Sequence, residues 1–305
     1  MQTKKLYTGQ EMPVLGLGTW KSLGNTVAPA VEYALTQAGY THIDCAPIYR
    51  NEKEVGQGFK EAFAQGIKRE DIFITSKLWN TDHRPEYVEQ ACRKTLSDLG
   101  LEYLDLYLMH WGIAFPHEEN LEPVDKDGHA VLDTVSIRET WEAMEQLVKK
   151  GLVKAIGVAN FTTMMLVDLL SSAKVRPAVN QIELHPYNSQ QDLVDFCAYE
   201  KIAVTAYSPL GRQGADREGP RIFDEKLVQS LAKKYNKTEG QILLRWGIQR
   251  GTIVIPKSIH ENRIAENSSV FDFSLSDEEM QKISNLNKNY RFVNPTGWWK
   301  IPYFI

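Results

Sequence analysis

The 305-residue sequence contains only three cysteines, Cys45, Cys92 and Cys197. They are scattered and form no C-x-x-C pair, so the sequence indicates neither a disulfide framework nor a cysteine metal site, and a reducing compartment is expected. No apolar run approaches the ~18 residues that a membrane span requires. The lysines near the start are not followed by an apolar run, so no secretory signal is visible. We therefore expect a cytoplasmic protein.

Neither sign of charge predominates, because 35 Lys and Arg stand against 39 Asp and Glu. Nucleic-acid binding needs a dominant basic surface, so this balance argues against nucleic acid as the main partner. Hydrophobic residues make up 43% of the chain, which is enough for one large core or two smaller ones. These features leave a soluble globular protein, most often an enzyme, with no membrane partner. Apart from composition, we expect a small-molecule partner and a monomer or weak dimer.

Short aliphatic or β-branched runs alternate along the chain with stretches of helical apolar spacing. The runs are nearly continuous in apolar residues, as expected of buried parallel strands. They cover residues 14–17, 41–44, 71–75, 104–109, 153–158, 178–182, 202–206 and 252–255. Capping-box pairs predict where three of the helices begin: Ser136 with Glu139, Thr238 with Gln241, and Ser276 with Glu279.

Eight such alternations predict an α/β fold, a closed (β/α)₈ TIM barrel that forms one domain over residues 1–305. The residues beyond the ~250 of a typical barrel fall before the first strand, in 111–135 and after 286. We expect a short N-terminal β-hairpin and an aromatic-rich C-terminal loop there. The rival is an open doubly wound sheet, whose dinucleotide turn would read Gly-x-Gly-x-x-Gly. Gly16 and Gly18 lack the third glycine of that turn.

Polar side chains follow three neighbouring predicted strands, at the end of a barrel where chemistry takes place. They are Asp44, Tyr49, Lys77 and His110. Taken singly, Asp44 could cap a helix, Tyr49 could be a loop aromatic and His110 a buried histidine. Lys77 has no such simple structural role, because burying an unpaired ammonium at the end of an apolar strand costs much free energy. Asp44 on the adjacent strand is its expected partner.

These four groups suit the protonation of an oxyanion. A phenol has a pKa near ~10, which is high for proton donation at neutral pH, and a close ammonium favours the phenolate. We therefore expect Lys77, fixed by Asp44, to lower the pKa of Tyr49. A neutral His110 can donate a hydrogen bond to a carbonyl oxygen. The set contains no nucleophile and no histidine pair for a metal, so a metal-dependent barrel hydrolase is not favoured.

Eight motifs, in their order and spacing, resemble the aldo-keto reductase family. They lie at residues 15–20, 43–52, 75–79, 108–111, 156–161, 179–181, 208–211 and 255–258. The tail resembles that of the aldose (xylose) reductase and plant sugar-phosphate reductase branch. The resemblance implies that Asp44, Tyr49, Lys77 and His110 form the catalytic tetrad, that Tyr49 donates the proton, and that the hydride comes from a reduced nicotinamide.

The resemblance also implies binding residues. Asn160 and Gln181 would hold the nicotinamide carboxamide, and Tyr207 would stack on the ring. The full set of implied cofactor contacts is Thr19, Trp20, Asp44, Asn160, Gln181, Tyr207, Ser208, Leu210, Lys257, Ser258, Arg263, Glu266 and Asn267. The implied substrate contacts are Trp20, Trp79, His110, Trp111 and Trp298. Ala159 stands where the family usually has serine, so one hydrogen bond to the carboxamide should be absent. Pro47 stands where the family often has histidine, and we expect it to stiffen the loop between Asp44 and Tyr49.

The choice of cofactor can be argued from charge. The last predicted strand runs into Lys257 and Ser258, with Arg263 following. Barrels often bind phosphate in this region, and two cations with a hydroxyl suit a 2′-phosphate better than a ribose hydroxyl pair. A solvated basic loop is the plainer alternative. We expect NADPH, with NADH used more weakly, and we expect residues 211–216 to fold over the pyrophosphate as a clasp.

The sequence thus predicts an NADPH-dependent reductase that converts aldoses and small aromatic or aliphatic aldehydes to primary alcohols. Two alternatives stay open at this point. One is a sugar-phosphate reductase, and the other is a barrel that binds NADP(H) as a regulatory or sensor protein without turnover.

Overall fold

The computed structural model describes residues 2–22, 24–212 and 219–304. Within these ranges the central sheet has eight parallel strands, each hydrogen-bonded to the next in chain order. They are β3 (Leu17–Gly18), β4 (His42–Asp44), β5 (Phe73–Leu78), β6 (Leu104–Met109), β7 (Val153–Ala159), β8 (Val179–Glu183), β9 (Ala203–Tyr207) and β10 (Ile253–Val254).

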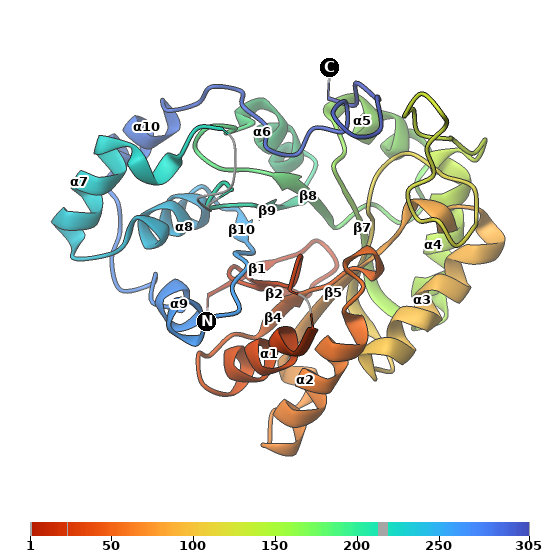
Figure 1. Cartoon of the computed structure of the whole chain (residues 1–305), viewed down its shortest axis with the longest axis horizontal. Coiled ribbons are helices and arrows are strands. Elements are labelled where there is room, and N and C mark those ends of the chain that lie inside the picture. Colours follow the sequence, from red (N-terminus) through yellow and green to blue (C-terminus); the bar gives the residue numbers. More distant parts are fainter. Residues whose placement is uncertain (1, 23, 213–218, 305) are drawn as a thin grey trace.

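The two ends of this sheet meet. Parallel bridges join Leu15 to Val254 and Gly18 to Lys257. The Gly16 amide donates to the Val254 carbonyl at 2.9 Å, and the Gly18 amide donates to Pro256 at 3.0 Å. These bridges close the sheet on itself, and the predicted (β/α)₈ barrel is confirmed. Figure 1 shows the helices arranged around the strands.

Helices connect the strands and surround them. The α-helices are α1 (Val27–Thr36), α2 (Glu52–Ala64), α3 (Pro85–Leu99), α4 (Ile137–Lys149), α5 (Thr163–Ser172), α6 (Gln191–Tyr199), α7 (Lys226–Tyr235), α8 (Glu239–Gln249), α9 (Glu261–Ser268) and α10 (Asp277–Ser284). The three predicted capping boxes are present at the starts of α4, α8 and α10. No helix in the described ranges is long and apolar enough to cross a membrane.

Short 3₁₀ helices occupy several of the connections. They are η1 (Gly24–Thr26), η2 (Pro47–Tyr49), η3 (Arg69–Asp71), η4 (Asn80–Asp82) and η5 (Ile222–Asp224). Of these, η2 bears most directly on the site, because Tyr49 is its last residue.

The observed strands differ from the predicted ones mainly at their ends. β5 begins at Phe73 and runs to Leu78, so Lys77 lies inside the strand and not just after it. The residues around Lys77 are fully buried, and the pairing of Lys77 with Leu108 of β6 continues the ladder through it. The apolar run itself ends at residue 75, and the ion pair with Asp44 of β4 lets the buried strand continue through Lys77.

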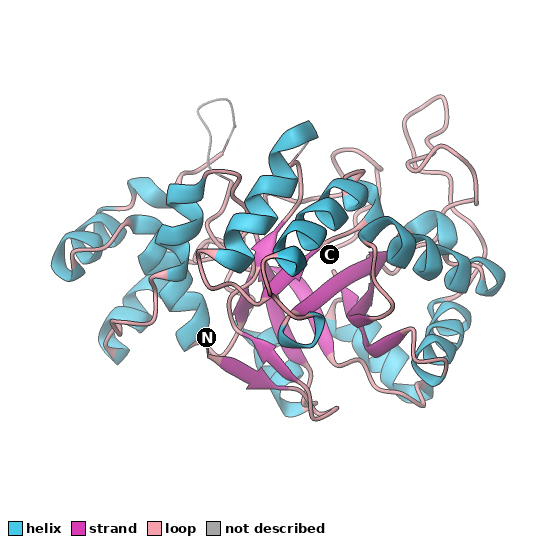
Figure 2. Ribbon diagram, turned by 90° about the horizontal axis from the view of Figure 1, so that it is seen from below, coloured by secondary structure: helices cyan, strands magenta, loops and turns pink. Residues whose placement is uncertain are grey.

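An N-terminal hairpin of β1 (Thr3–Lys5) and β2 (Glu11–Pro13) lies at one end of the molecule (Figure 2). Its Leu6 and Met12 are buried in one cluster with residues that face into the barrel, such as Leu106 and Ala155. The hairpin therefore fills the barrel at this end, and the interior is a packed core as in other barrels of this kind. The opposite mouth is left to the loops that follow the strands.

The chain ends in a tail, residues 285–304, all of which the structure describes and none of which lies in a helix or strand. The predicted aromatic-rich C-terminal loop is thus confirmed. One of its tryptophans, Trp299, is buried with Trp79, Trp111 and Phe115. The tail therefore covers part of the mouth to which β5 and β6 lead.

Candidate active site

The barrel brings the four predicted catalytic side chains to one mouth. Asp44 ends β4, Tyr49 ends η2, Lys77 lies near the end of β5, and His110 follows β6. Lys77 Nζ donates to Asp44 Oδ1 at 2.5 Å and to the carbonyl of Cys45 at 2.8 Å. The same nitrogen lies 5.1 Å from the centre of the Tyr49 ring, and the Tyr49 and His110 rings are 6.0 Å apart.

The electrostatics of Tyr49 differ from the prediction. The pKa of Tyr49 is raised to about 12, and the largest cause is burial of the side chain. The charge of Lys77 and a hydrogen bond between the two side chains act in the opposite direction and offset part of this rise. The predicted direction of the lysine's effect is therefore correct, but the expected net lowering is wrong, because desolvation of the phenolate outweighs the ammonium.

A proton donor with this pKa still suits an alkoxide. A protonated Tyr49 is the form present across the neutral range. An alkoxide is about as basic as hydroxide, whose parent water has a pKa of ~15.7. Transfer of a proton from the phenol to an alkoxide is therefore favourable without further lowering of the phenol's pKa.

His110 is a neutral imidazole. Burial lowers its pKa well below the usual value, and the nearby Lys77 and His83 lower it further. The indole of Trp79 meets the imidazole edge-on, with ring centres 5.1 Å apart. A neutral imidazole can donate one N–H to a carbonyl oxygen and cannot repel Lys77, so its state is compatible with the predicted role.

Three of the predicted nicotinamide contacts are joined to this group by hydrogen bonds. Gln181 Nε2 donates to Asp44 Oδ2 at 2.7 Å, and Tyr207 donates its hydroxyl hydrogen to Asn160 Oδ1 at 2.7 Å. Asn160 Nδ2 in turn donates to the carbonyl of His110 at 2.9 Å. Asn160 has a φ of +63°, a backbone conformation that asparagine tolerates better than most residues. The structure therefore brings these side chains together.

Further predicted cofactor contacts lie around the mouth. Thr19 Oγ1 donates to the carbonyl of Asp44 at 2.8 Å. Lys21 and Arg212 both lie over the Trp20 ring, at 4.6 and 5.5 Å from its centre. Ser208 and Leu210 follow β9, and residues 213–216 of the predicted clasp lie outside the described residues.

The predicted phosphate contacts lie in the segment that follows β10 and in the first turn of α9. Lys257 and Arg263 are exposed, and Ser258 Oγ accepts a hydrogen bond from the His260 amide at 3.1 Å just before α9 begins. Glu266 accepts a hydrogen bond from Thr238. Two cations beside a helix N-terminus form a donor set that fits a 2′-phosphate.

Asn267, the last of the predicted cofactor contacts, is buried one residue after Glu266 in α9. Among the described residues, no group of three or more His, Cys, Asp or Glu side chains could hold a metal ion.

Comparisons with known proteins fit this geometry. The model of the aldo/keto reductase family matches residues 14–288. Aldo-keto reductase family 1 member A1 of Sus scrofa and of Homo sapiens are each 52% identical to the chain over 295 residues, which is 95% of this chain and 90% of each relative. The chain belongs to the aldo/keto reductase family. It is therefore an oxidoreductase.

Solved structures of other aldo-keto reductases match nearly the whole fold. The aldose reductase of Schistosoma japonicum superposes with a TM-score of 0.93 at 43% identity, over 99% of this chain and 98% of the other. A Bombyx mori aldo-keto reductase in complex with NADP gives 0.89 at 40% identity, with the same coverage.

Trp79, Trp111 and Trp299 form an aromatic wall in this aldo-keto reductase, and Trp298, which was predicted to contact the substrate, lies at its outer side. Trp79 and Trp111 are buried, and Trp299 packs against both, with ring centres 6.1 and 5.3 Å away. Trp298, the predicted tail contact, is 40% exposed and touches the group through Trp299. The sequence shows two adjacent tryptophans, and only the path of the tail decides which one faces inward.

Glu183 was not among the residues predicted from the sequence. It is the last residue of β8 and is buried, and its carboxylate faces the tail. A signal was available, because side chains alternate along a strand and Glu183 stands two residues after Gln181. The two must therefore face the same side of the sheet.

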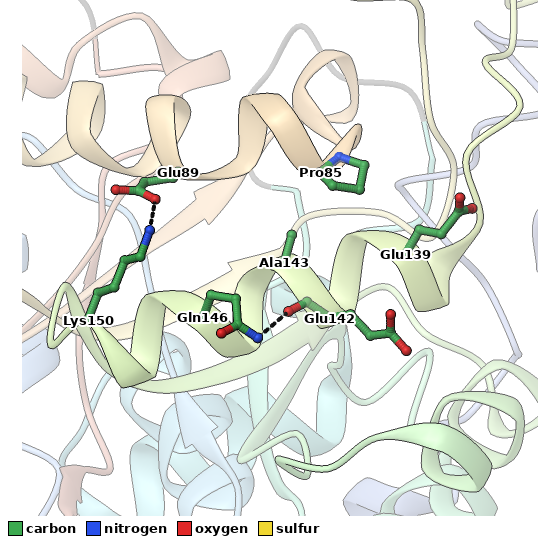
Figure 3. A pocket seen from close by; sticks show the side chains of 7 residues that line it. All are labelled: Pro85, Glu89, Glu139, Glu142, Ala143, Gln146 and Lys150. Carbon is green, nitrogen blue, oxygen red and sulfur yellow. Dashed lines mark hydrogen bonds and ion pairs between the residues drawn. The ribbon is translucent and has the colours of Figure 1, made fainter.

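A separate groove of about 350 Å³ lies on the outside of this aldo-keto reductase, between α3 and α4 (Figure 3). Glu89 forms an ion pair with Lys150 across it, and Gln146 donates to the backbone carbonyl of Glu142. Its lining comes from the flanks of two helices and includes none of the predicted site residues. The groove therefore stands apart from the mouth described above.

Proposed function

We propose that the chain reduces aldehydes, including aldoses and small aromatic or aliphatic aldehydes, to primary alcohols with NADPH, and that Tyr49 donates the proton. The observation that carries the proposal is the phenol of Tyr49 beside a buried ammonium that is itself fixed by a carboxylate. The neutral His110 next to it provides the second hydrogen-bond donor for a carbonyl oxygen.

When bound, the reduced nicotinamide supplies a hydride to the carbonyl carbon. Asn160, Gln181 and Tyr207 are the residues that would hold the ring, and the donor set of Lys257, Ser258 and Arg263 would hold the 2′-phosphate. The bound NADP of the Bombyx mori relative supports this choice of cofactor. Ala159 offers no hydroxyl to the carboxamide, and a neutral hydrogen bond contributes ~1 kcal/mol, so cofactor binding survives its absence.

The residues of the chain then carry the proton. His110 orients the carbonyl oxygen toward Tyr49, and the hydroxyl hydrogen of Tyr49 moves to that oxygen as negative charge develops on it. Lys77 stabilises the phenolate that remains, and Asp44 keeps Lys77 charged and in place. The apolar wall of Trp79, Trp111 and Trp299 excludes water and discriminates weakly among substrates.

The experiment is a steady-state screen of NADPH and NADH oxidation with three groups of substrates: free aldoses, sugar phosphates, and aromatic and aliphatic aldehydes. We expect glyceraldehyde and aromatic aldehydes to be reduced, with NADPH preferred. Quenching of protein fluorescence by NADPH without turnover of any substrate would instead identify a sensor barrel. A large preference for phosphorylated over free aldoses would identify a sugar-phosphate reductase. We also propose that the protein is cytoplasmic and a monomer or weak dimer.

A further inference from the structure

Glu183 binds the C-terminal tail directly. Its Oε1 accepts a hydrogen bond from the Phe292 amide at 2.7 Å, and its Oε2 accepts one from the next amide, that of Val293, at 3.0 Å. His185 Nε2 lies 2.9 Å from Oε1, and because a carboxylate only accepts, the imidazole proton is on Nε2. One buried carboxylate thus fixes two consecutive residues of the tail.

The hydrogen bonds from the tail to Glu183 are stronger than ordinary neutral hydrogen bonds. Both side chains of the Glu183–His185 pair are fully buried, and hydrogen bonds to a charged acceptor are about twice as strong as those between neutral groups. A groove of about 760 Å³ runs beside it, lined by the starts of α5 and α6 and by tail residues such as Arg291 and Phe304. The tail is therefore not packed continuously against the barrel here, and hydrogen bonds hold it in place.

The contact of Glu183 with the Phe292 and Val293 amides lies between the proposed nicotinamide contacts and the aromatic wall. In the sheet register Glu183 pairs with Tyr207, the proposed nicotinamide contact. Six residues beyond Val293 along the tail, Trp299 enters the aromatic wall beside Phe115, 5.0 Å between ring centres. A shift of the tail at residues 292–293 therefore moves Trp299 and with it the aromatic wall that a bulky substrate would contact. The side chains of Lys77 and His110 beside Tyr49 do not belong to the tail and keep their positions.

We propose that Glu183 is a positioning residue that sets substrate specificity: by holding the Phe292 and Val293 amides it seats the tail, and the seated tail forms the wall for the distal part of large aldehydes. The inference rests on the proposed reductase activity. It assigns Glu183 no contact with the reacting atoms.

The test compares two aldehydes in the variant Glu183→Gln. Glutamine has one acceptor oxygen, and its NH₂ group would face an amide N–H, so one of the two tail contacts is lost. We expect kcat/KM for naphthaldehyde to fall about tenfold, mainly through KM, which matches the loss of one buried hydrogen bond to a charged group. The kcat/KM for glyceraldehyde, which is too short to reach the tail, should stay within about twofold, since its reaction depends on groups that do not move.

Two further variants keep the test decisive. Val293→Pro removes one tail donor and leaves Glu183 untouched, so it should reproduce the selective loss even where Glu183→Gln does not fold. Glu279→Gln is the matched control. Glu279 is another buried carboxylate, with three donors, Lys234, Tyr235 and the Ser276 amide, but it lies on α10 away from the mouth. It should leave the ratio of the two substrates unchanged.

Hydrogen exchange gives an independent readout. The amides of residues 292 and 293 should exchange slowly in the wild-type protein and faster in Glu183→Gln. An equal loss on both aldehydes, no loss on either, or the same selectivity change in Glu279→Gln would overturn the inference. A wild-type protein that reduces neither aldehyde would instead overturn the proposed function.

Discussion

Lys77 Nζ and Asp44 Oδ1 lie 2.5 Å apart, and the two side chains are 0% and 2% exposed. A buried ion pair is weak evidence for stability, because the loss of hydration offsets much of the attraction. The pair holds the Lys77 ammonium in a fixed position beside the Tyr49 hydroxyl. Its contribution to stability and its contribution to activity should therefore separate on mutation.

The first prediction separates the contribution of the Lys77–Asp44 pair to stability from its contribution to activity. Lys77→Met leaves the Asp44 carboxylate without its cation and should lower the free energy of unfolding by about 3 kcal/mol. The double variant Asp44→Asn with Lys77→Met removes both charges and should regain most of that loss while remaining inactive. Urea unfolding and NADPH oxidation with glyceraldehyde measure the two effects. An active double variant, or a Lys77→Met protein as stable as the wild type, would contradict this account.

The second prediction concerns the proton donor. Tyr49→Phe keeps the ring and removes the hydroxyl, so NADPH affinity should stay within about twofold while kcat for glyceraldehyde falls roughly 10²–10⁴-fold, the usual contribution of a general acid. Fluorescence titration and steady-state kinetics check the two parts. Tyr199→Phe, on an exposed tyrosine of α6, is the control and should change neither. Unchanged turnover in Tyr49→Phe would remove Tyr49 from its proposed role.

Much of this fold could be predicted from the sequence, because a barrel repeats one local pattern. The run 104–109 matches the observed bounds of β6, since the strand is buried along its whole length and Asp105 is its one charged residue. The strands at the seam, β3 and β10, are only two residues long. The predicted run 252–255 extends one residue beyond β10 at each end, and the predicted run 14–17 shares only Leu17 with β3. The seam is held partly by single bridges, whose positions depend on how the sheet closes.

The candidate site likewise has features that could be predicted from the sequence and features that could not. Asp44, Lys77 and His110 could be found because each follows or ends an apolar run, and strand ends share one mouth. The net pKa of Tyr49 could not be predicted, because it depends on how completely the phenol is buried. The inward position of Trp299 and the contact of Glu183 with residues 292–293 depend on where the tail returns to the barrel, more than 100 residues from β8 in sequence.

The third prediction tests the phosphate contacts. Lys257→Ala and Arg263→Ala should each raise the Kd for NADPH about tenfold or more, the loss of one charge-assisted hydrogen bond, and leave the Kd for NADH within about twofold. Fluorescence titration with both cofactors measures this. Lys282→Ala, which removes an exposed cation paired with Glu278 on α10, is the matched control. Equal weakening of NADPH and NADH would show that the two residues do not contact the 2′-phosphate.

The fourth prediction is the pH dependence of stability. Burial lowers the pKa of His42 to about 4 in the folded protein, while an unfolded histidine titrates near ~6.5. Between these values the unfolded state binds more protons, so stability is full above pH ~6.5 and falls as the pH falls toward 4, by about 2 kcal/mol at pH 5. Glu52 acts in the opposite direction, because burial raises its pKa to about 7 and the folded state takes up its proton first.

Because Glu52 opposes His42, and the buried His83 and His110 act in the same direction as His42, only a comparison of variants isolates His42. His42→Gln keeps a polar group near Thr75, the present hydrogen-bond partner at 3.3 Å, and removes the titration. The difference in the free energy of unfolding between pH 7.5 and pH 5 should shrink by about 2 kcal/mol relative to the wild type. His129→Gln, on a side chain that is 59% exposed, should leave that difference unchanged. If His42→Gln loses as much stability at pH 5 as the wild type does, the acid sensitivity comes from another group.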